Sequence, residues 1–152
     1  MIRFSKEDLS QLLSLLGQEL GIMKQMRELT ENQADLLAAD DIDAFDKSLE
    51  SRQALIDNMS GLHQESDVLM QSYITFSKSK GGKKIDAVET AAEDLRKAIK
   101  ECADINSRNA ARAKEKSEEY SKQIEKLALE RKSIGAYALS VPNDPEHFDT
   151  KT

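Results

Sequence analysis

The chain has 152 residues, of which 33% are charged and 5% aromatic, with two prolines and no tryptophan. This length suits one domain with a real core, and this composition is typical of long, solvated helices. The net charge of −6 is uneven, because residues 1–76 hold 6 Lys and Arg against 14 Asp and Glu. An acidic first half argues against nucleic acid and anionic membranes as partners, since each needs a basic face.

The single cysteine, Cys102, excludes an internal disulfide and is typical of a reducing compartment. The N-terminal segment MIRFSKEDLS lacks the pattern of a signal peptide, because acidic residues follow the first basic ones. The sequence holds no window of about 18 consecutive apolar residues, so we expect no membrane insertion. We therefore expect a cytoplasmic protein.

The first predicted helix covers about residues 5–38 and begins at a capping box formed by Ser5 and Asp8. Leucines and methionines follow at steps of three and four, which places them on one face of a helix. Methionines at this spacing usually belong to a core, with an adaptable binding surface as the alternative. The stripe consists of Leu9, Leu12, Leu13, Leu16, Leu20, Met23, Met26, Leu29 and Leu37.

The second predicted helix covers about residues 41–77 and follows the acidic sequence ADDIDAF, whose aspartates favour a helix N-terminus. Two series of residues recur every seven positions along it. Interleaved repeats of this kind over five heptads predict a coiled-coil-like antiparallel pairing. One series is Ile42, Leu49, Ile56, His63 and Met70, and the other is Phe45, Arg52, Met59, Ser66 and Tyr73.

The basic segment SKSKGGKK at residues 77–84 predicts an interhelical loop. Its Gly-Gly-Lys sequence is not a P-loop, because the spaced glycines, the following Ser or Thr and the preceding strand are all missing.

The third predicted helix covers about residues 85–137, with an apolar stripe that thins over 106–123 and then resumes. At 1.5 Å per residue it is about 80 Å long, against about 50 Å for the earlier segments, so its C-terminal end should protrude. The predicted fold is therefore all-α, an antiparallel bundle or coiled coil of three long helices. One helical domain is expected over residues 1–137, followed by a flexible C-terminal tail over 138–152.

No group of residues predicts a catalytic, metal or cofactor site. His63 is interpreted as a tolerated polar member of a heptad series, with a phosphorelay histidine as the alternative, which no further motif supports. His147 has acidic neighbours but no second histidine or cysteine at ligand spacing. Cys102 lies on an apolar stripe as a small core residue would, and no nucleophile has a base partner. We expect no enzyme and no cofactor.

Two segments carry a resemblance to a known family. They are ELTENQADLLAADDIDAFDKSLESRQALIDNMSGL at residues 28–62 and KSIGAYALSVPNDPEHFDTKT at 132–152. The first resembles the FlgN family of flagellar export chaperones, and the second is similar to the ending of such chaperones from Gram-positive-type bacteria. FliT-type chaperones of the filament cap are the near alternative.

The resemblance implies a small cytoplasmic helical protein that binds hook-associated junction proteins, prevents their premature assembly and escorts them to the flagellar export apparatus. In that family the C-terminal helical region holds the substrate. Carried over by position, the implied partner-binding residues are Tyr120, Ile124, Leu127, Ile134 and Tyr137. Phe148 and the acidic tail have no assigned family role. A structural coiled coil, in which the same stripe closes a homodimer, is the alternative that the sequence leaves open.

Overall fold

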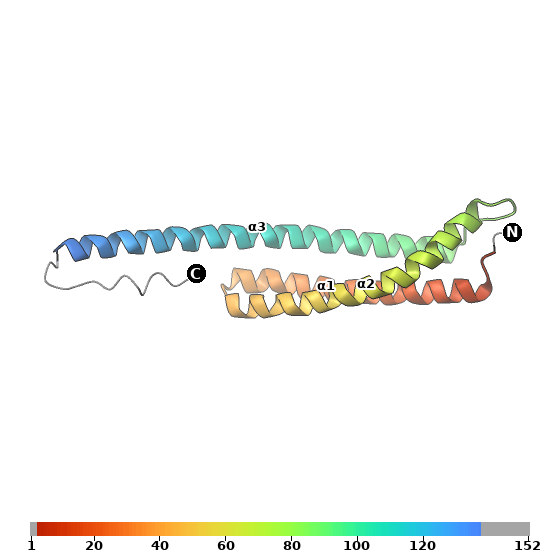
Figure 1. The fold of residues 1–152 in the computed structure, drawn as a ribbon, viewed down its shortest axis with the longest axis horizontal. Helices are drawn as coiled ribbons and strands as arrows, with labels where there is room; N and C mark the ends of the chain where they lie inside the picture. The colour runs from red at the N-terminus through yellow and green to blue at the C-terminus, as the bar shows by residue number, and fades with distance from the viewer. Residues whose placement is uncertain (1–2, 138–152) are drawn as a thin grey trace. The chain divides into compact units, whose positions relative to one another are not determined.

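The computed structural model describes residues 3–137, and for residues 131–137 it describes the helical backbone alone. Helix α1 covers Lys6–Ala38, α2 covers Ile42–Lys78 and α3 covers Asp86–Tyr137 (Figure 1). No strand occurs in the described range. The predicted all-α fold of three long helices is confirmed. The tail predicted over 138–152, with His147 and Phe148, lies outside the described residues.

The chain divides into two compact units, residues 1–111 and residues 112–152, and each is described by itself. The first unit contains α1, α2 and the part of α3 that ends at residue 111. The second contains the remainder of α3. A single helical domain over residues 1–137 stays a prediction.

The first two helices begin at the side-chain caps that the sequence predicts. Asp8 donates its backbone N–H to the Ser5 hydroxyl at 3.0 Å, and Ser5 donates its own N–H to the Asp8 carboxylate at 3.0 Å. At the second helix the Asp41 carboxylate accepts the N–H of Ala44 at 3.2 Å. Such caps satisfy amide groups that a helix leaves unpaired and fix where it starts.

The apolar core of the first unit joins all three helices. Leu12 of α1 and Val88 of α3 are fully buried, and Tyr73 of α2 is 2% exposed. Burying a large apolar side chain stabilises a fold by about 1.5–3 kcal/mol, so this cluster holds the three helices together. Its buried members are Leu12, Leu16, Met23, Met26, Tyr73, Val88, Leu95 and Cys102.

Tyr73 fixes the start of α3 against the end of α2. Its hydroxyl accepts the backbone N–H of Ile85 at 2.8 Å and donates to the Glu89 carboxylate at 2.8 Å. Phe4 meets the tyrosine ring edge-on, with ring centroids 5.5 Å apart, and stacks on Phe76 at 6.0 Å. Burial, more than the neighbouring carboxylates, raises the pKa of Tyr73 above its ordinary value of 10.0, and the N–H of Ile85 opposes the shift.

The connection between α2 and α3 needs its paired glycines. Gly81 adopts φ of 80°, a left-handed conformation that glycine reaches without strain. A Cβ atom at Gly82 would lie 1.9 Å from the carbonyl oxygen of Phe76, a backbone atom that cannot turn aside. The Gly-Gly pair therefore serves the turn.

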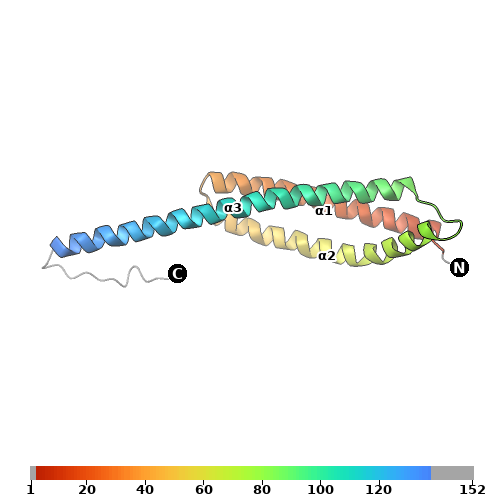
Figure 2. The ribbon, with the colours of Figure 1, turned by 90° about the horizontal axis from the view of Figure 1, so that it is seen from above.

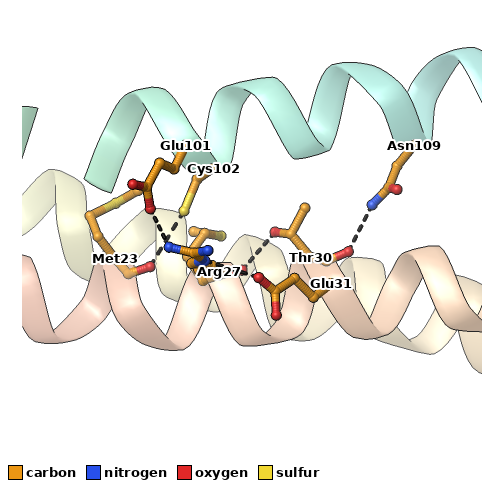
Figure 3. A network of polar contacts seen from close by, with 8 residues as sticks. Met23, Arg27, Thr30, Glu31, Glu101, Cys102 and Asn109 are labelled. Atoms are coloured by element: carbon orange, nitrogen blue, oxygen red, sulfur yellow. Dashed lines mark hydrogen bonds and ion pairs between the residues drawn. The ribbon is translucent and has the colours of Figure 1, made fainter. Parts of the chain in front are cut away.

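The opposite end of the first unit is held by buried polar side chains. Asn109 of α3 donates to the carbonyl of Thr30 in α1 at 2.8 Å (Figure 3). Gln33 of α1 donates to the Ser48 hydroxyl of α2 at 2.9 Å. All four residues are buried, so each of these hydrogen bonds sits where water cannot easily replace it.

An exposed charge pair and a buried thiol also join α1 to α3 (Figure 3). Arg27 forms ion pairs with Glu31 in the next turn of α1 and with Glu101 of α3. The hydrogen bond to Glu31, followed by the charge of Glu101, raises the pKa of Arg27. Cys102 donates its S–H to the carbonyl of Met23 at 3.4 Å. Cys102 is 3% exposed and belongs to the core, and this burial raises the pKa of its thiol above the ordinary value.

The prediction that both heptad series of α2 form a buried seam is wrong for part of one series. The heptad series from Phe45 to Tyr73 turns inward and is buried or half-buried. In the other series Met70 is half-buried against the core, but Ile42 is 36% exposed, Leu49 46% and Ile56 37%. The two series lie only about 60° apart around α2, so they form one stripe, and the side of it that carries Phe45 and Tyr73 is the more deeply buried one.

Candidate partner-binding surface

The described side chains of the second unit, from 112 to 130, lie on the surface of α3. Only Ala113 and Lys116 among them are half-buried, and the others are exposed. Three of the sequence-predicted site residues belong here: Tyr120 is 39% exposed, Ile124 63% and Leu127 60%. Large apolar side chains with this exposure add little to the stability of the unit that carries them.

Local sequence explains why this stretch is helical without a core. It consists mostly of Ala, Lys, Glu, Gln and Leu, which are strong helix formers. Glu118 and Lys122 stand four apart with the acid first, the order that favours a helix. The segment keeps a helical backbone and leaves its apolar residues on the surface.

Tyr120, Ile124 and Leu127 share one face of the helix. At about 100° per residue they fall within about 60° of one another. Leu129, which is 67% exposed, falls on roughly the opposite face and does not belong to this stripe. We call Tyr120, Ile124 and Leu127 the arm stripe. Ile134 and Tyr137 belong to α3, but their side chains lie outside those described.

The arm stripe offers contact area and no reactive group. A stripe of this width matches one face of a second helix. The tyrosine adds a ring with a hydroxyl that tolerates water when the surface is empty. The stripe is thus suited to hold another helix.

A second candidate surface lies within the first unit, between α2 and α3, and the sequence did not predict it. Figure 2 shows α2 separated from α3 over the middle of the bundle. Two neighbouring cavities of about 390 and 220 Å³ occupy this groove and share His63 and Ile99. Met23 of α1 lines the larger cavity and Leu16 of α1 the smaller one. We call this feature the α2–α3 groove.

Two charged side chains of the groove carry buried atoms without a partner. Glu19 of α1 is 0% exposed, and its Oε1 lies 3.2 Å from Nδ1 of the largely exposed His63. Its other oxygen, Oε2, has no hydrogen-bond partner among the described residues, and neither has Nε of Arg52. Glu19 lines the smaller cavity and Arg52 the larger.

The spacing of the apolar residues in α1 already marks Glu19 as unusual. Glu19 lies three residues after Leu16 and four before Met23, which is a stripe position of α1. A charged residue at such a position is either a local fault or a functional group. His63, interpreted from sequence as a polar residue of a buried seam, instead sits exposed beside this carboxylate.

Neither surface assembles a metal site, since no group of three or more potential ligands exists among residues 3–130. In the same part of the chain, no helix is long and apolar enough to cross a membrane.

The described residues form an all-α bundle that exposes apolar side chains on α3, a surface suited to contact with another polypeptide. A family model described as FlgN protein matches residues 1–138, so the chain belongs to the FlgN family. Members of this family are flagellar export chaperones that bind hook-associated proteins, and the family is not one of enzymes. No curated protein and no solved structure matches the chain.

Proposed function

We propose that this chain binds the terminal segments of hook-associated junction proteins, prevents their premature assembly and delivers them to the flagellar export apparatus. The arm stripe is the binding surface, continued by Ile134 and Tyr137 along the same helix. The proposed location is the cytoplasm, where the cargo is made.

The observation that carries the proposal is the exposure of Tyr120, Ile124 and Leu127 on one face of a helix. Exposed apolar stripes are costly to keep in water and commonly mark sites of protein association. A cargo segment that becomes helical on binding would cover the stripe as one helix covers another.

The complex must also come apart at the export apparatus. A segment that is disordered before binding loses conformational entropy when it folds, which lowers the net affinity for a given contact area. A helix-on-helix contact of this kind can therefore be specific and still release its cargo.

A homodimer closed by the same stripe is the competing interpretation, and it makes a different prediction. We expect the purified chain to capture a hook-associated protein from a motile source cell, identified by mass spectrometry, and the isolated pair to bind with one-to-one stoichiometry in calorimetry. A stable homodimer that binds no hook-associated protein would contradict the proposal.

A further inference from the structure

The first unit carries opposite charges at its two ends. Residues 31–46, around the α1–α2 turn, hold six Asp and Glu and no Lys or Arg, whereas residues 77–84, at the α2–α3 connection, hold four Lys and no acidic residue. Figures 1 and 2 show the turn and the connection at opposite ends of the first unit. The unit is therefore strongly polarised along α2.

The start of the chain adds two cations to the basic end. Phe4 packs against the rings of Tyr73 and Phe76 near the end of α2. This contact places the exposed Arg3 and Lys6 at the same end as the α2–α3 connection. The basic end thus extends over the N-terminal segment as well as the connection.

Most of the charges at both ends are available to a partner. The connection holds one ion pair, in which Lys84 lies 3.8 Å from Glu89. Other charged side chains of the two ends are exposed and have no ionic partner among the described residues. This group includes Lys78, Lys80, Lys83, Asp43 and Asp46.

An exposed apolar face of α2 runs between the two charged ends. Its members are Ile42, which is 36% exposed, Leu49 at 46%, Ile56 at 37% and Ile74 at 36%. At about 100° per residue these four side chains fall within about 40° of one another. We call them the α2 face. Exposed apolar side chains that gather on one face commonly mark a site of protein association.

We propose that the α2 face binds a second copy of this chain, with the two α2 helices antiparallel and the acidic end of each copy beside the basic end of the other. α2 covers Ile42–Lys78, so a pair centred on its middle sets residues 40–46 of each copy beside residues 74–80 of the other. The aspartates of the turn then lie along the lysines of the connection. This dimer does not use the arm stripe and does not depend on the export function.

The charges select this arrangement over two others. A parallel pair would set the acidic segment 31–46 of one copy against the same segment of the other, and like charges repel. End-on contact between an acidic and a basic end would leave the α2 face uncovered and would continue into an open chain of copies. The antiparallel pair neutralises both ends and closes as a two-fold dimer.

The contact should be reversible and sensitive to salt. Exposed ion pairs contribute little individually and are screened as the ionic strength rises. The same side of α2 also carries polar residues, Ser60 and Asp67 among them, which limits the apolar contact. We expect the Kd of the dimer to rise at least tenfold between about 0.05 and 0.5 M NaCl.

The test is sedimentation equilibrium of the full chain and of two charge-reversed variants. The acidic-end variant carries Asp43→Lys and Asp46→Lys, and the basic-end variant carries Lys78→Glu and Lys80→Glu. Each variant alone sets like charges together, so we expect its dimer Kd to rise at least tenfold. A one-to-one mixture of the two should regain a dimer of nearly wild-type Kd, because opposite charges meet again at both ends. Circular dichroism and a thermal melt check that each variant is folded.

A matched pair of substitutions tests the apolar part of the contact. Leu49 belongs to the α2 face, whereas Val68 lies about 100° away around the same helix and is 67% exposed. Leu49→Asp should raise the dimer Kd at least tenfold, and Val68→Asp should leave it unchanged. Both variants should keep their helical circular dichroism because both side chains are exposed.

Three outcomes would overturn the proposal. The chain could remain monomeric at every concentration, or the mixture of charge-reversed variants could dimerise no better than either variant alone. A dimer that resists Leu49→Asp but dissociates on Leu127→Ala would assign the contact to the arm stripe. Because none of these readouts uses a hook-associated protein, failure here leaves the proposed function to its own test.

Discussion

Three single leucine-to-alanine variants distinguish a partner-binding role of the arm stripe from a structural role. Leu127 is 60% exposed on the arm stripe, Leu129 is 67% exposed on the opposite face, and Leu12 is fully buried. Truncating a buried leucine costs about 2–5 kcal/mol, or a fall in Tm on the order of 10 °C for a chain of this size. Leu127→Ala and Leu129→Ala expose little new area, so each should change the free energy of unfolding by less than about 1 kcal/mol.

The binding assay separates the two exposed leucines. Titration with the captured hook-associated protein should show a loss of about 1–2 kcal/mol for Leu127→Ala, roughly five- to thirtyfold in Kd, and none for Leu129→Ala. Leu12→Ala serves as the stability control, because it lowers the Tm while the remaining folded molecules bind normally. If Leu127→Ala lowered the Tm as Leu12→Ala does, or if both exposed variants bound equally well, the arm stripe would not be the cargo surface.

Three further predictions concern the first unit. Gly82→Ala should lower the free energy of unfolding by about 1–3 kcal/mol in urea titrations, because its Cβ would overlap a backbone oxygen, whereas Gly17→Ala, with nothing within 4 Å, should raise it by about 0.5–1 kcal/mol. Tyr73→Phe should cost about 1–3 kcal/mol by leaving the N–H of Ile85 unpaired. Since the folded state raises the pKa of Tyr73, its contribution is complete below pH 10.0 and declines above it, so the wild-type chain should lose more stability than the Phe variant when the pH is raised past that value. Cys102, whose thiol is buried and has a raised pKa, should react with an alkylating reagent at least tenfold more slowly in the folded chain than in urea; equal rates would contradict its burial.

Periodicity predicted the helices and the inward face of α1 because those signals are local. The caps at Ser5 and Asp41 were likewise readable, since each depends on side chains within three residues of the helix start. The partner of each face was not readable. Ile42 and Tyr73 belong to equally regular repeats, yet one is exposed and the other buried, and neither repeat shows which part of α2 a neighbouring helix covers.

The groove escaped prediction for a related reason. Its walls come from α2 and α3, and the partner of Glu19 lies 44 positions away in the sequence. A pattern within one helix does not show how far apart two helices, here α2 and α3, lie in the folded chain. The arm stripe was visible from the sequence, because it needs only three residues on one face of one helix.

The unequal ends of the first unit imply that the bundle opens from one side. Near the α2–α3 connection, the core is apolar and tied by Tyr73, whereas near the α1–α2 turn, Thr30, Gln33, Ser48 and Asn109 form much of the buried layer, with Leu37 as its main large apolar member. A hydrogen bond contributes about 0.5–1.5 kcal/mol net, which is less than the burial of a large apolar side chain contributes. Amide hydrogens around this turn should exchange through local opening well before those beside Tyr73. The end of the first unit at the α1–α2 turn is therefore the end from which local opening should begin, while the other end stays closed.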